Sequence, residues 1–338
     1  MIIEAVAKSN LILQRAQLNK GAVLMESQPM FSVIFTSYNG GEYVADSLDS
    51  IISQNTNYSY EIIVCDDCST DNTREVLLFY KKKYPDLIKL ILNKKNLGGP
   101  GLNFWNAVTC CSGKYIMVGQ DDDLWLPNRV AVMIAYMEQH PYVDSCHLNS
   151  RECITTDNKR FPIVGVDTSC YLKKEVFHID GIGDVGIWYT STINFEKRLY
   201  EEAAHDGLGI LGLCIRRDIL NTLMEEVNPV KKKFIWNEEP IAFWLAERNN
   251  HALIDFDGQL SRFGHSNLTF NKNIYLMLRR SFKFWGMRIF YFNFYYHKRI
   301  NPIHLFFKNC VFIPIMIIKS LKTKYVQLFK TDVNIINP

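Results

Sequence analysis

Residues 31–41 read FSVIFTSYNGG, and this stretch decides the fold class. Its first five residues are mostly β-branched or aromatic and predict a short buried strand, while Ser-Tyr-Asn-Gly-Gly predicts a tight loop. Apolar residues at helical spacing then predict a helix over 43–53. A strand that passes through a tight loop into a helix is the repeating unit of parallel α/β sheets.

The same unit recurs along the first half of the chain. Further strands are predicted over 60–64, 87–92 and 115–118, and further helices over 73–83, 102–111 and 128–140. This alternation predicts an α/β fold with a doubly wound, mostly parallel sheet flanked by helices. After residue 141 the pattern loosens, and strands are expected again over 252–263. Ligands bind such sheets at the carboxyl ends of the strands, where the polar and glycine-rich clusters of this sequence fall.

Three adjacent carboxylates, Asp121–Asp123, follow the strand predicted over 115–118. Like charges this close raise each other's pKa unless a cation lies among them. A hard divalent cation with oxygen ligands, Mg²⁺ or Mn²⁺, is the natural partner. The alternative is a solvated acidic turn, but the flanking apolar strand and the following Trp-Leu-Pro favour a functional site.

Two other strand ends carry candidate ligand-binding groups. One carboxylate of Asp66-Asp67 could accept a hydrogen bond from a nucleobase or a ribose hydroxyl, while the other serves the turn or caps the next helix. The loop 96–101, NLGGPG, permits close backbone approach to a ligand. It lacks the Gly-Lys-Ser/Thr ending of a phosphate-binding loop and is a weak signal alone.

Two later clusters could contribute acid–base or metal chemistry. Glu238-Glu239 precedes Pro240 and an apolar helix pattern, which suits a general base, although acids and proline also favour helix N-termini. His265, in the stretch Arg262–Asn267, could bind a metal or a diphosphate, or be a structural histidine.

Composition bounds the class of protein. The chain has 338 residues, of which 48% are hydrophobic and 22% charged, so it can bury a core, and disordered and collagen-like classes are excluded. The net charge of +3 argues against a dedicated nucleic-acid binder. Residues 279–338 contain eleven Lys or Arg and one acidic residue, Asp332, so their net charge is +10. The other 278 residues therefore carry a net charge of −7. Two different surfaces are therefore expected.

The ends of the chain have their own patterns. Residues 1–29 predict a helical extension without a signal peptide, and nine irregularly spaced cysteines indicate a reduced, cytoplasmic protein. Residues 271–338 predict a basic, aromatic helical region whose apolar runs are too short to span a bilayer. It suits an anionic membrane surface, which would make the protein peripheral on the inner face of the cell membrane. The alternative is a subdomain that packs on the core or forms a homodimer.

Three motifs in order, 31–40, 62–71 and 120–127, resemble those of family 2 glycosyltransferases with the GT-A fold, in the rhamnosyltransferase-like branch that serves polysaccharide assembly. The resemblance implies an inverting, metal-dependent transfer of a sugar from a nucleotide-diphosphate sugar to a hydroxyl of a glycan or lipid-linked acceptor. It also implies one GT-A domain over 30–270, with a nucleotide-sugar half over 30–140 and an acceptor half over 141–270.

The resemblance assigns roles to matching residues. It implies that the nucleotide sugar is bound by Thr36, Ser37, Tyr38, Asp67, Asn96, Gly98, Asn103 and Asp121. The implied ligands of the divalent cation are Asp122, Asp123 and His265. The catalytic base would be Glu239, or Glu238 if the alignment shifts by one residue. Two positions depart from the family pattern: Gln120 stands where many members have an Asp, and Cys68 where they have a Gly.

Two other classes of function compete with this interpretation. A nucleotidyltransferase would need a Lys or Arg in the glycine-rich loop after the first strand, and residues 37–41 contain none. A non-catalytic nucleotide- or glycan-binding homologue would be expected to lose the metal and base acids, but all of them are present.

Overall fold

A computed structural model describes residues 28–154, 171–190, 210–229, 241, 244, 245, 248 and 250–263. Nearly all of the predicted N-terminal extension 1–29 and the whole C-terminal region 271–338 lie outside the described residues. None of the helices that the structure describes is long and apolar enough to cross a membrane.

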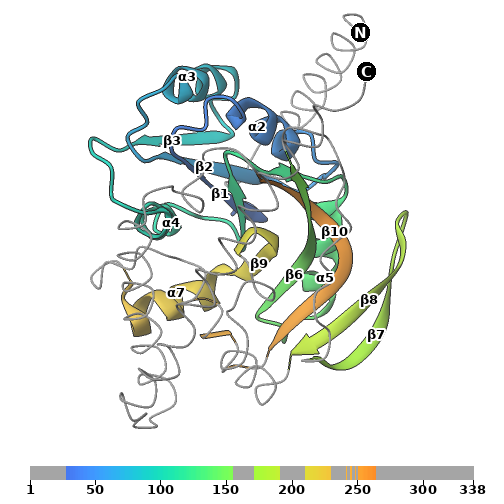
Figure 1. Ribbon diagram of the computed structural model, residues 1–338. Helices are drawn as coiled ribbons and strands as arrows, with labels where there is room; N and C mark the ends of the chain where they lie inside the picture. Colours follow the sequence, from blue (N-terminus) through green and yellow to red (C-terminus); the bar gives the residue numbers. More distant parts are fainter. Residues whose placement is uncertain are drawn as a thin grey trace, which may run out of the picture. The chain divides into compact units, whose positions relative to one another are not determined.

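The described residues form a ten-stranded sheet with helices packed against it (Figure 1). Its strands are β1 (Phe31–Ser37), β2 (Tyr60–Asp66), β3 (Ile88–Leu92), β4 (Tyr115–Gln120), β5 (Leu124–Trp125), β6 (Ser145–Ile154), β7 (Tyr171–Ile179), β8 (Gly183–Thr190), β9 (Leu213–Arg216) and β10 (His251–Phe263). The helices are α2 (Val44–Ile52), α3 (Thr73–Lys83), α4 (Pro100–Val108), α5 (Arg129–Gln139) and α7 (Arg217–Val227), with a short 3-10 turn η3 (Ile210–Gly212).

The first four long strands confirm the prediction of a doubly wound α/β sheet. They lie in the order β3-β2-β1-β4, and every neighbouring pair is parallel. In Figure 1, α2 and α3 lie on one side of these strands and α4 on the other. The register pairs Ser37 with Asp66 and Thr36 with Gln120, so the ends of β1, β2 and β4 lie together at one edge. This is the edge where the sequence places its polar clusters.

The second half of the chain continues the same sheet with mixed strand directions. Strand β9 is antiparallel to both β4 and β6, whereas β6 and β10 are parallel. Strands β7 and β8 form an antiparallel hairpin at the far edge. The short β5 leaves this order and pairs with β10, with Trp125 opposite Gln259. That pairing brings the segment after β4 onto a strand more than a hundred residues later.

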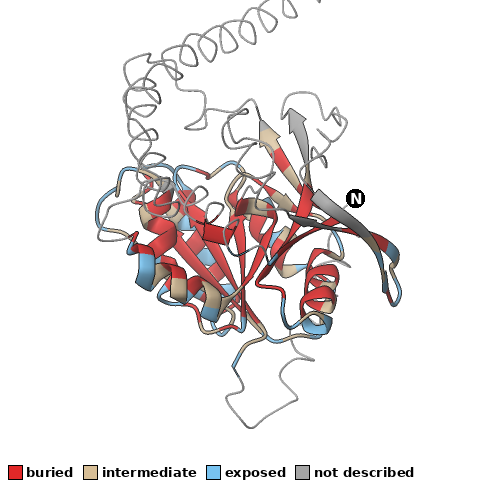
Figure 2. Cartoon of the chain, turned by 90° about the horizontal axis from the view of Figure 1, so that it is seen from below, coloured by how far each residue is buried: buried red, intermediate tan, exposed pale blue. Residues whose placement is uncertain are grey.

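One hydrophobic core joins the two halves. Residues from β1, such as Val33 and Phe35, share it with Met133 of α5 and Ile254 of β10, and all four are fully buried. Figure 2 shows the burial following the sheet and the inner sides of the helices. Burying each such side chain stabilises the fold by about 1.5–3 kcal/mol, so neither half is expected to be stable alone.

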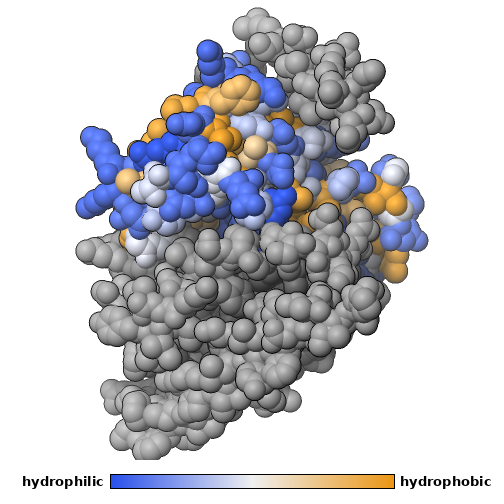
Figure 3. Space-filling model, turned by 45° about the horizontal axis from the view of Figure 1, so that its top comes forward, coloured by the Kyte–Doolittle hydropathy of each residue, from blue (hydrophilic) through white to orange (hydrophobic). Residues whose placement is uncertain are grey.

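The helices present polar outer faces. On the face turned to the viewer in Figure 3, hydrophilic side chains surround a smaller group of hydrophobic ones. Helix α3 departs from this in part: Leu77 and Tyr80 are buried, but the apolar Leu78 and Phe79 point outward with 52% and 60% of their surface exposed. Scattered apolar side chains of this kind are normal on protein surfaces and indicate no site.

Candidate active site

The acidic triplet forms the turn between β4 and β5. The N–H of Asp123 donates to the carbonyl oxygen of Gln120 at 3.5 Å and closes the turn. Asp121 and Asp122 are half-buried, whereas Asp123 is only 5% exposed. The turn stands where β1 and β4 end, so the structure brings the triplet to the predicted edge of the sheet.

Asp121 fastens the loop that follows β1. Its carboxylate accepts hydrogen bonds from the Ser37 hydroxyl at 2.6 Å and from the Tyr38 N–H at 2.8 Å. Its carbonyl oxygen accepts a bond from the Ser47 hydroxyl at 3.0 Å. Gly40 packs so closely that a Cβ there would lie 2.2 Å from the Asp121 carboxylate, so only glycine fits. The structure therefore brings together three of the predicted nucleotide-sugar residues: Ser37, Tyr38 and Asp121.

Asp123 is directed the other way, onto β10. One carboxylate oxygen accepts a hydrogen bond from the Gln259 side-chain amide at 3.0 Å, and the other accepts one from the Arg262 N–H at 3.0 Å. The Arg262 guanidinium lies over the Tyr43 ring and pairs with Asp46 at 3.0 Å. The triplet thus spans the gap between the loop after β1 and the end of β10.

The electrostatics of the triplet suit a cation. Burial, together with the charge of Asp122, raises the pKa of Asp121 to about 7 and raises that of Asp123 well above its ordinary value. Burial is the larger cause of both shifts, and a divalent cation at this turn would oppose them by stabilising the charged carboxylates. Mg²⁺ in nucleotide sites commonly takes one or two carboxylates and completes its shell with phosphate oxygens and water. The donor set here fits that chemistry.

The outer two members of the triplet are held by neighbouring segments, and the metal-ligand role of Asp122 stays a prediction. Both carboxylate oxygens of Asp123 accept hydrogen bonds from β10, and the Asp121 carboxylate accepts two from the loop after β1. Among the residues that the structure describes, no group of three His, Cys, Asp or Glu side chains is arranged to hold a metal ion. A metal-ligand role for Asp123 stays a prediction.

Asp67 organises the loop after β3. One of its carboxylate oxygens accepts hydrogen bonds from the Leu97 N–H at 2.9 Å and from the Asn93 side-chain amide at 3.0 Å. The Asn96 amide donates to the Asp67 carbonyl oxygen at 3.0 Å. Burial raises the pKa of the Asp67 carboxyl, and these bonds oppose that rise. Asp67 is 4% exposed, and its role in binding a nucleobase stays a prediction.

Asn93, which the sequence analysis did not single out, joins two of the predicted site residues. Its amide also donates to the Asn103 side-chain oxygen at 3.0 Å, and the Asn103 amide donates to the Cys65 carbonyl oxygen at 2.7 Å. Asn93 therefore links Asp67 to the predicted donor-side residue Asn103. The sequence position of Asn93 could have indicated this, because Asn93 directly follows β3 at the same edge of the sheet as the other polar clusters.

Two backbone conformations shape the loops at this edge. Gly98 has φ +88° and open space where a Cβ would stand, so its backbone is accessible in a conformation that glycine adopts readily. Cys68 has φ 64°, in the left-handed region that disfavours side chains with a Cβ. This left-handed conformation explains why glycine suits the position of Cys68 in the 62–71 motif of the family that the sequence resembles.

The loops after β1 and β2 are tied to each other. The Asn39 N–H donates to the Ser69 hydroxyl at 2.9 Å, and the Thr70 N–H donates to the Asn39 side-chain oxygen at 2.8 Å. Thr36 and Ser37 are 8% and 3% exposed beneath these loops, and Tyr38 is 38% exposed at their rim. Of the three residues predicted to line the base and ribose pocket, Tyr38 is therefore the most accessible to a ligand.

Three predicted site residues are not placed. Glu238, Glu239 and His265 lie outside the described residues. Just after the glutamate pair, Trp244 is 2% exposed and its indole N–H donates to Glu226 of α7 at 2.8 Å.

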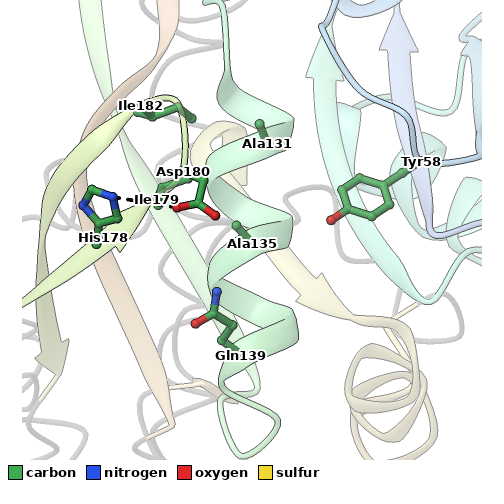
Figure 4. A pocket seen from close by; sticks show the side chains of 8 residues that line it. All are labelled: Tyr58, Ala131, Ala135, Gln139, His178, Ile179, Asp180 and Ile182. Carbon is green, nitrogen blue, oxygen red and sulfur yellow. Dashed lines mark ion pairs between the residues drawn. The ribbon is translucent and has the colours of Figure 1, made fainter.

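A separate cavity lies between α5 and the turn of the β7–β8 hairpin (Figure 4). It has a volume of about 300 Å³ and is lined by Tyr58, Ala131, Ala135, Gln139, His178, Ile179, Asp180 and Ile182. His178 and Asp180 form an ion pair of 3.8 Å at its rim, and both are strongly exposed. None of the predicted site residues that the structure describes lines this cavity, so the candidate site rests on the strand ends.

Comparisons with known proteins agree with this geometry. Residues 32–187 match the family described as Glycosyl transferase family 2. The putative glycosyltransferase EpsE of Bacillus subtilis is 39% identical over 117 residues, which are 34% of this chain and 41% of that protein. The Escherichia coli enzyme WfgD, a UDP-Glc:alpha-D-GlcNAc-diphosphoundecaprenol beta-1,3-glucosyltransferase, is 35% identical over 109 residues, 32% of this chain and 41% of that protein.

A solved structure extends the comparison to the fold. Staphylococcus aureus TarS, residues 1–349 with UDP-GlcNAc, superposes with a TM-score of 0.50 at 18% identity, covering 70% of this chain and 59% of that one. The matches to curated relatives span less than half of those proteins' length. The acidic turn at the edge of a doubly wound sheet, the ordered motifs and these matches show that residues 32–187 resemble family 2 glycosyltransferases and that the sheet has the GT-A fold.

Proposed function

We propose that this protein is an inverting, metal-dependent glycosyltransferase that moves a sugar from a nucleotide-diphosphate sugar to a hydroxyl of a glycan or lipid-linked acceptor, in cell-surface polysaccharide or glycolipid assembly. The observation that carries the proposal is the acidic turn 121–123, held between the loop after β1 and the end of β10. It faces the same sheet edge as the Asp67–Asn93 loop, so one ligand can contact both.

The described residues suit a donor with a base, a ribose and a diphosphate. Asp67 offers a buried carboxylate and the largely exposed 93–98 loop offers hydrogen-bonding groups for a base, while Tyr38 offers an exposed ring at the rim. Asp122 would hold Mg²⁺ or Mn²⁺ together with the diphosphate. When bound, the cation would neutralise the negative charge that develops on the leaving diphosphate. The fixed turn keeps Asp122 in place during the reaction, so little reorganisation is needed.

The transfer itself is a single displacement. The acceptor oxygen forms a bond to the anomeric carbon as the bond from that carbon to the diphosphate breaks, which inverts the configuration. The acceptor proton passes to Glu239, or to Glu238, and the nucleoside diphosphate leaves. Orientation of the acceptor hydroxyl and the anomeric carbon supplies much of the acceleration, because the positioned reactants lose no further translational freedom.

The names of the similar proteins suggest where to begin. TarS was solved with UDP-GlcNAc, and WfgD is named for transfer from UDP-Glc to a diphosphoundecaprenol-linked sugar. UDP-sugars are therefore the first donors to test, and a diphosphate-lipid-linked glycan is the first acceptor. The basic region 271–338 would bring the protein to a cytoplasmic membrane surface carrying such an acceptor, and sedimentation with anionic vesicles would test this. A homodimer is the competing role for that region.

A donor screen tests the proposal. Purified protein with Mn²⁺ or Mg²⁺ is mixed with UDP-, GDP- and dTDP-sugars, and nucleotide release and thermal stabilisation are measured with and without EDTA. We expect metal-dependent stabilisation and slow hydrolysis with one donor, abolished in Asp122→Asn and kept in the matched variant Asp86→Asn, whose carboxylate is exposed away from the turn. Metal-independent nucleotide binding without turnover would favour a non-catalytic homologue. Release of diphosphate during coupling of a sugar phosphate to a nucleotide would favour a nucleotidyltransferase.

A further inference from the structure

Arg129, the first residue of α5, is a cation buried completely beside the acidic turn. Its guanidinium donates to the Gln259 side-chain oxygen at 2.7 Å, to the Val118 carbonyl oxygen at 3.3 Å and to the Leu211 carbonyl oxygen. It also lies 4.1 Å from the centre of the Trp125 ring. One side chain thus contacts β4, η3, β5 and β10.

This placement is unfavourable for Arg129 alone. Burial removes the guanidinium from water and lowers its pKa to about 9. The N-terminus of a helix carries a partial positive charge, which repels a cation in the first turn. Residues that break local rules at a cost are expected to serve a site. The nearest such site is the acidic turn, which the Gln259 side-chain amide connects to Arg129.

The Gln259 side-chain amide connects Arg129 to Asp123. Because its oxygen accepts the bond from Arg129, its NH₂ group must face the other way, where it donates to Asp123 at 3.0 Å and to the Ser261 hydroxyl at 3.2 Å. Without Arg129 the amide could rotate and set its oxygen against the Asp123 carboxylate. The hydrogen bond from Arg129 therefore orients the Gln259 amide so that its NH₂ group, and not its oxygen, faces the Asp123 carboxylate.

We propose that Arg129 is a positioning residue that, through Gln259, fixes Asp123 on β10 and so orients its neighbour Asp122 toward the metal–diphosphate complex. The inference rests on the proposed function. Residues that orient metal ligands from behind typically contribute 10–100-fold to metal affinity when removed. We call this Arg129–Gln259–Asp123 connection the relay. A merely structural role for Arg129 would predict only a loss of stability on its replacement, whereas the relay also predicts a loss of metal affinity.

Two variants separate the relay from folding. Gln259→Glu keeps an oxygen for Arg129 to bind but replaces the donor to Asp123 with a second carboxylate oxygen, which repels it. Arg129→Met removes the cation and keeps most of the side-chain volume. Arg216→Met is the matched control, because Arg216 also binds backbone carbonyls, including that of Val143 at 2.8 Å, and lies over an aromatic ring. It stands at the opposite end of β4 from the triplet.

Calorimetric titration of Mn²⁺ into the protein with UDP, or with GDP or dTDP if the screen selects it, gives the readout, alongside urea unfolding. We expect Gln259→Glu and Arg129→Met to weaken Mn²⁺ binding about tenfold or more. Binding of the nucleotide without metal should change less than twofold, and Arg216→Met should lower stability without changing Mn²⁺ affinity.

Each outcome has a separate meaning. Wild-type Mn²⁺ affinity in both folded variants would overturn the relay while leaving the proposed function intact. Should Arg129→Met fail to fold, Gln259→Glu alone decides, since its ion pair with Arg129 preserves that contact. Absence of metal-dependent nucleotide binding in the wild-type protein would instead overturn the proposed function.

Discussion

Replacing His251 with glutamine should make the fold less sensitive to acid. His251 begins β10 and is 1% exposed, and its ring nitrogen lies 2.8 Å from the Ser145 hydroxyl. Burial, assisted by the nearby His147, lowers the pKa of His251 from 6.5 to about 3. The folded protein therefore keeps this ring neutral under conditions in which the unfolded chain protonates it.

The size of the effect follows from the two pKa values. Between pH 6.5 and about 3 the unfolded state binds the additional proton, so stability falls as the pH falls through this window. At pH 5.0 the His251 contribution is a loss of about 2 kcal/mol, and at pH 7.5 it is near zero. Because pH 5.0 lies well above the folded-state pKa, a change of one unit in that value barely alters the result. The variant should remove this loss.

Urea unfolding followed by fluorescence of the six tryptophans measures the effect. The free energy of unfolding is compared at pH 7.5 and 5.0 without metal, at constant ionic strength. Carboxylates such as Asp121, whose pKa is raised, act in the opposite direction in both proteins and cancel in the comparison. His178→Gln is the control, because a hydrogen bond to Asp184 raises the pKa of His178, so its removal should increase the acid loss. Parallel pH profiles for wild-type and His251→Gln protein would refute the reasoning.

Three further predictions test the site. Cys68→Gly should raise the urea midpoint, with a gain of about 1 kcal/mol, because relief of the left-handed conformation exceeds the entropy that glycine adds to the unfolded chain; a lower midpoint would contradict this. Asn93→Leu should weaken nucleotide binding about tenfold in calorimetry, since about 1–3 kcal/mol is lost when a buried partner is left unsatisfied, whereas the exposed Asn106→Leu should bind normally. Glu239→Gln should reduce turnover at least a hundredfold while nucleotide affinity is kept, and a larger loss in Glu238→Gln would move the base to that residue.

The first half of the fold could be predicted because each apolar strand segment is followed by a polar or glycine-rich turn that marks its end. The apolar runs at 31–35 and 60–64 are bounded by polar turns, and they became β1 and β2 with only small changes at their ends. The strand expected over 252–263 was likewise found as β10. In β1 and β2 the local pattern and the final environment agree, since almost every residue of both strands is buried.

The second half could not be predicted at the same level, because its contacts join residues far apart in sequence. Nothing local marks Gln259 as the partner of Asp123, 136 residues earlier, or Arg129 as the partner of Gln259, 130 residues away. Asn93 was missed for a different reason. A single asparagine after a strand is usually turn chemistry, and only the folded loop shows that it joins Asp67 to Asn103.

The acidic triplet combines two tasks that a single substitution would disturb together. In a tight turn, successive side chains leave in different directions, so three adjacent carboxylates can face three environments. Asp121 binds the loop after β1 and Asp123 binds β10, which joins the two halves of the domain, while Asp122 stands between them. Loss of activity in Asp121→Asn or Asp123→Asn therefore cannot be attributed to a lost metal ligand, because each change also removes charge from a hydrogen-bond acceptor that holds the turn. A variant that loses metal affinity out of proportion to its change in the free energy of unfolding would identify the ligand, and Asp122→Asn is the variant from which we expect that result.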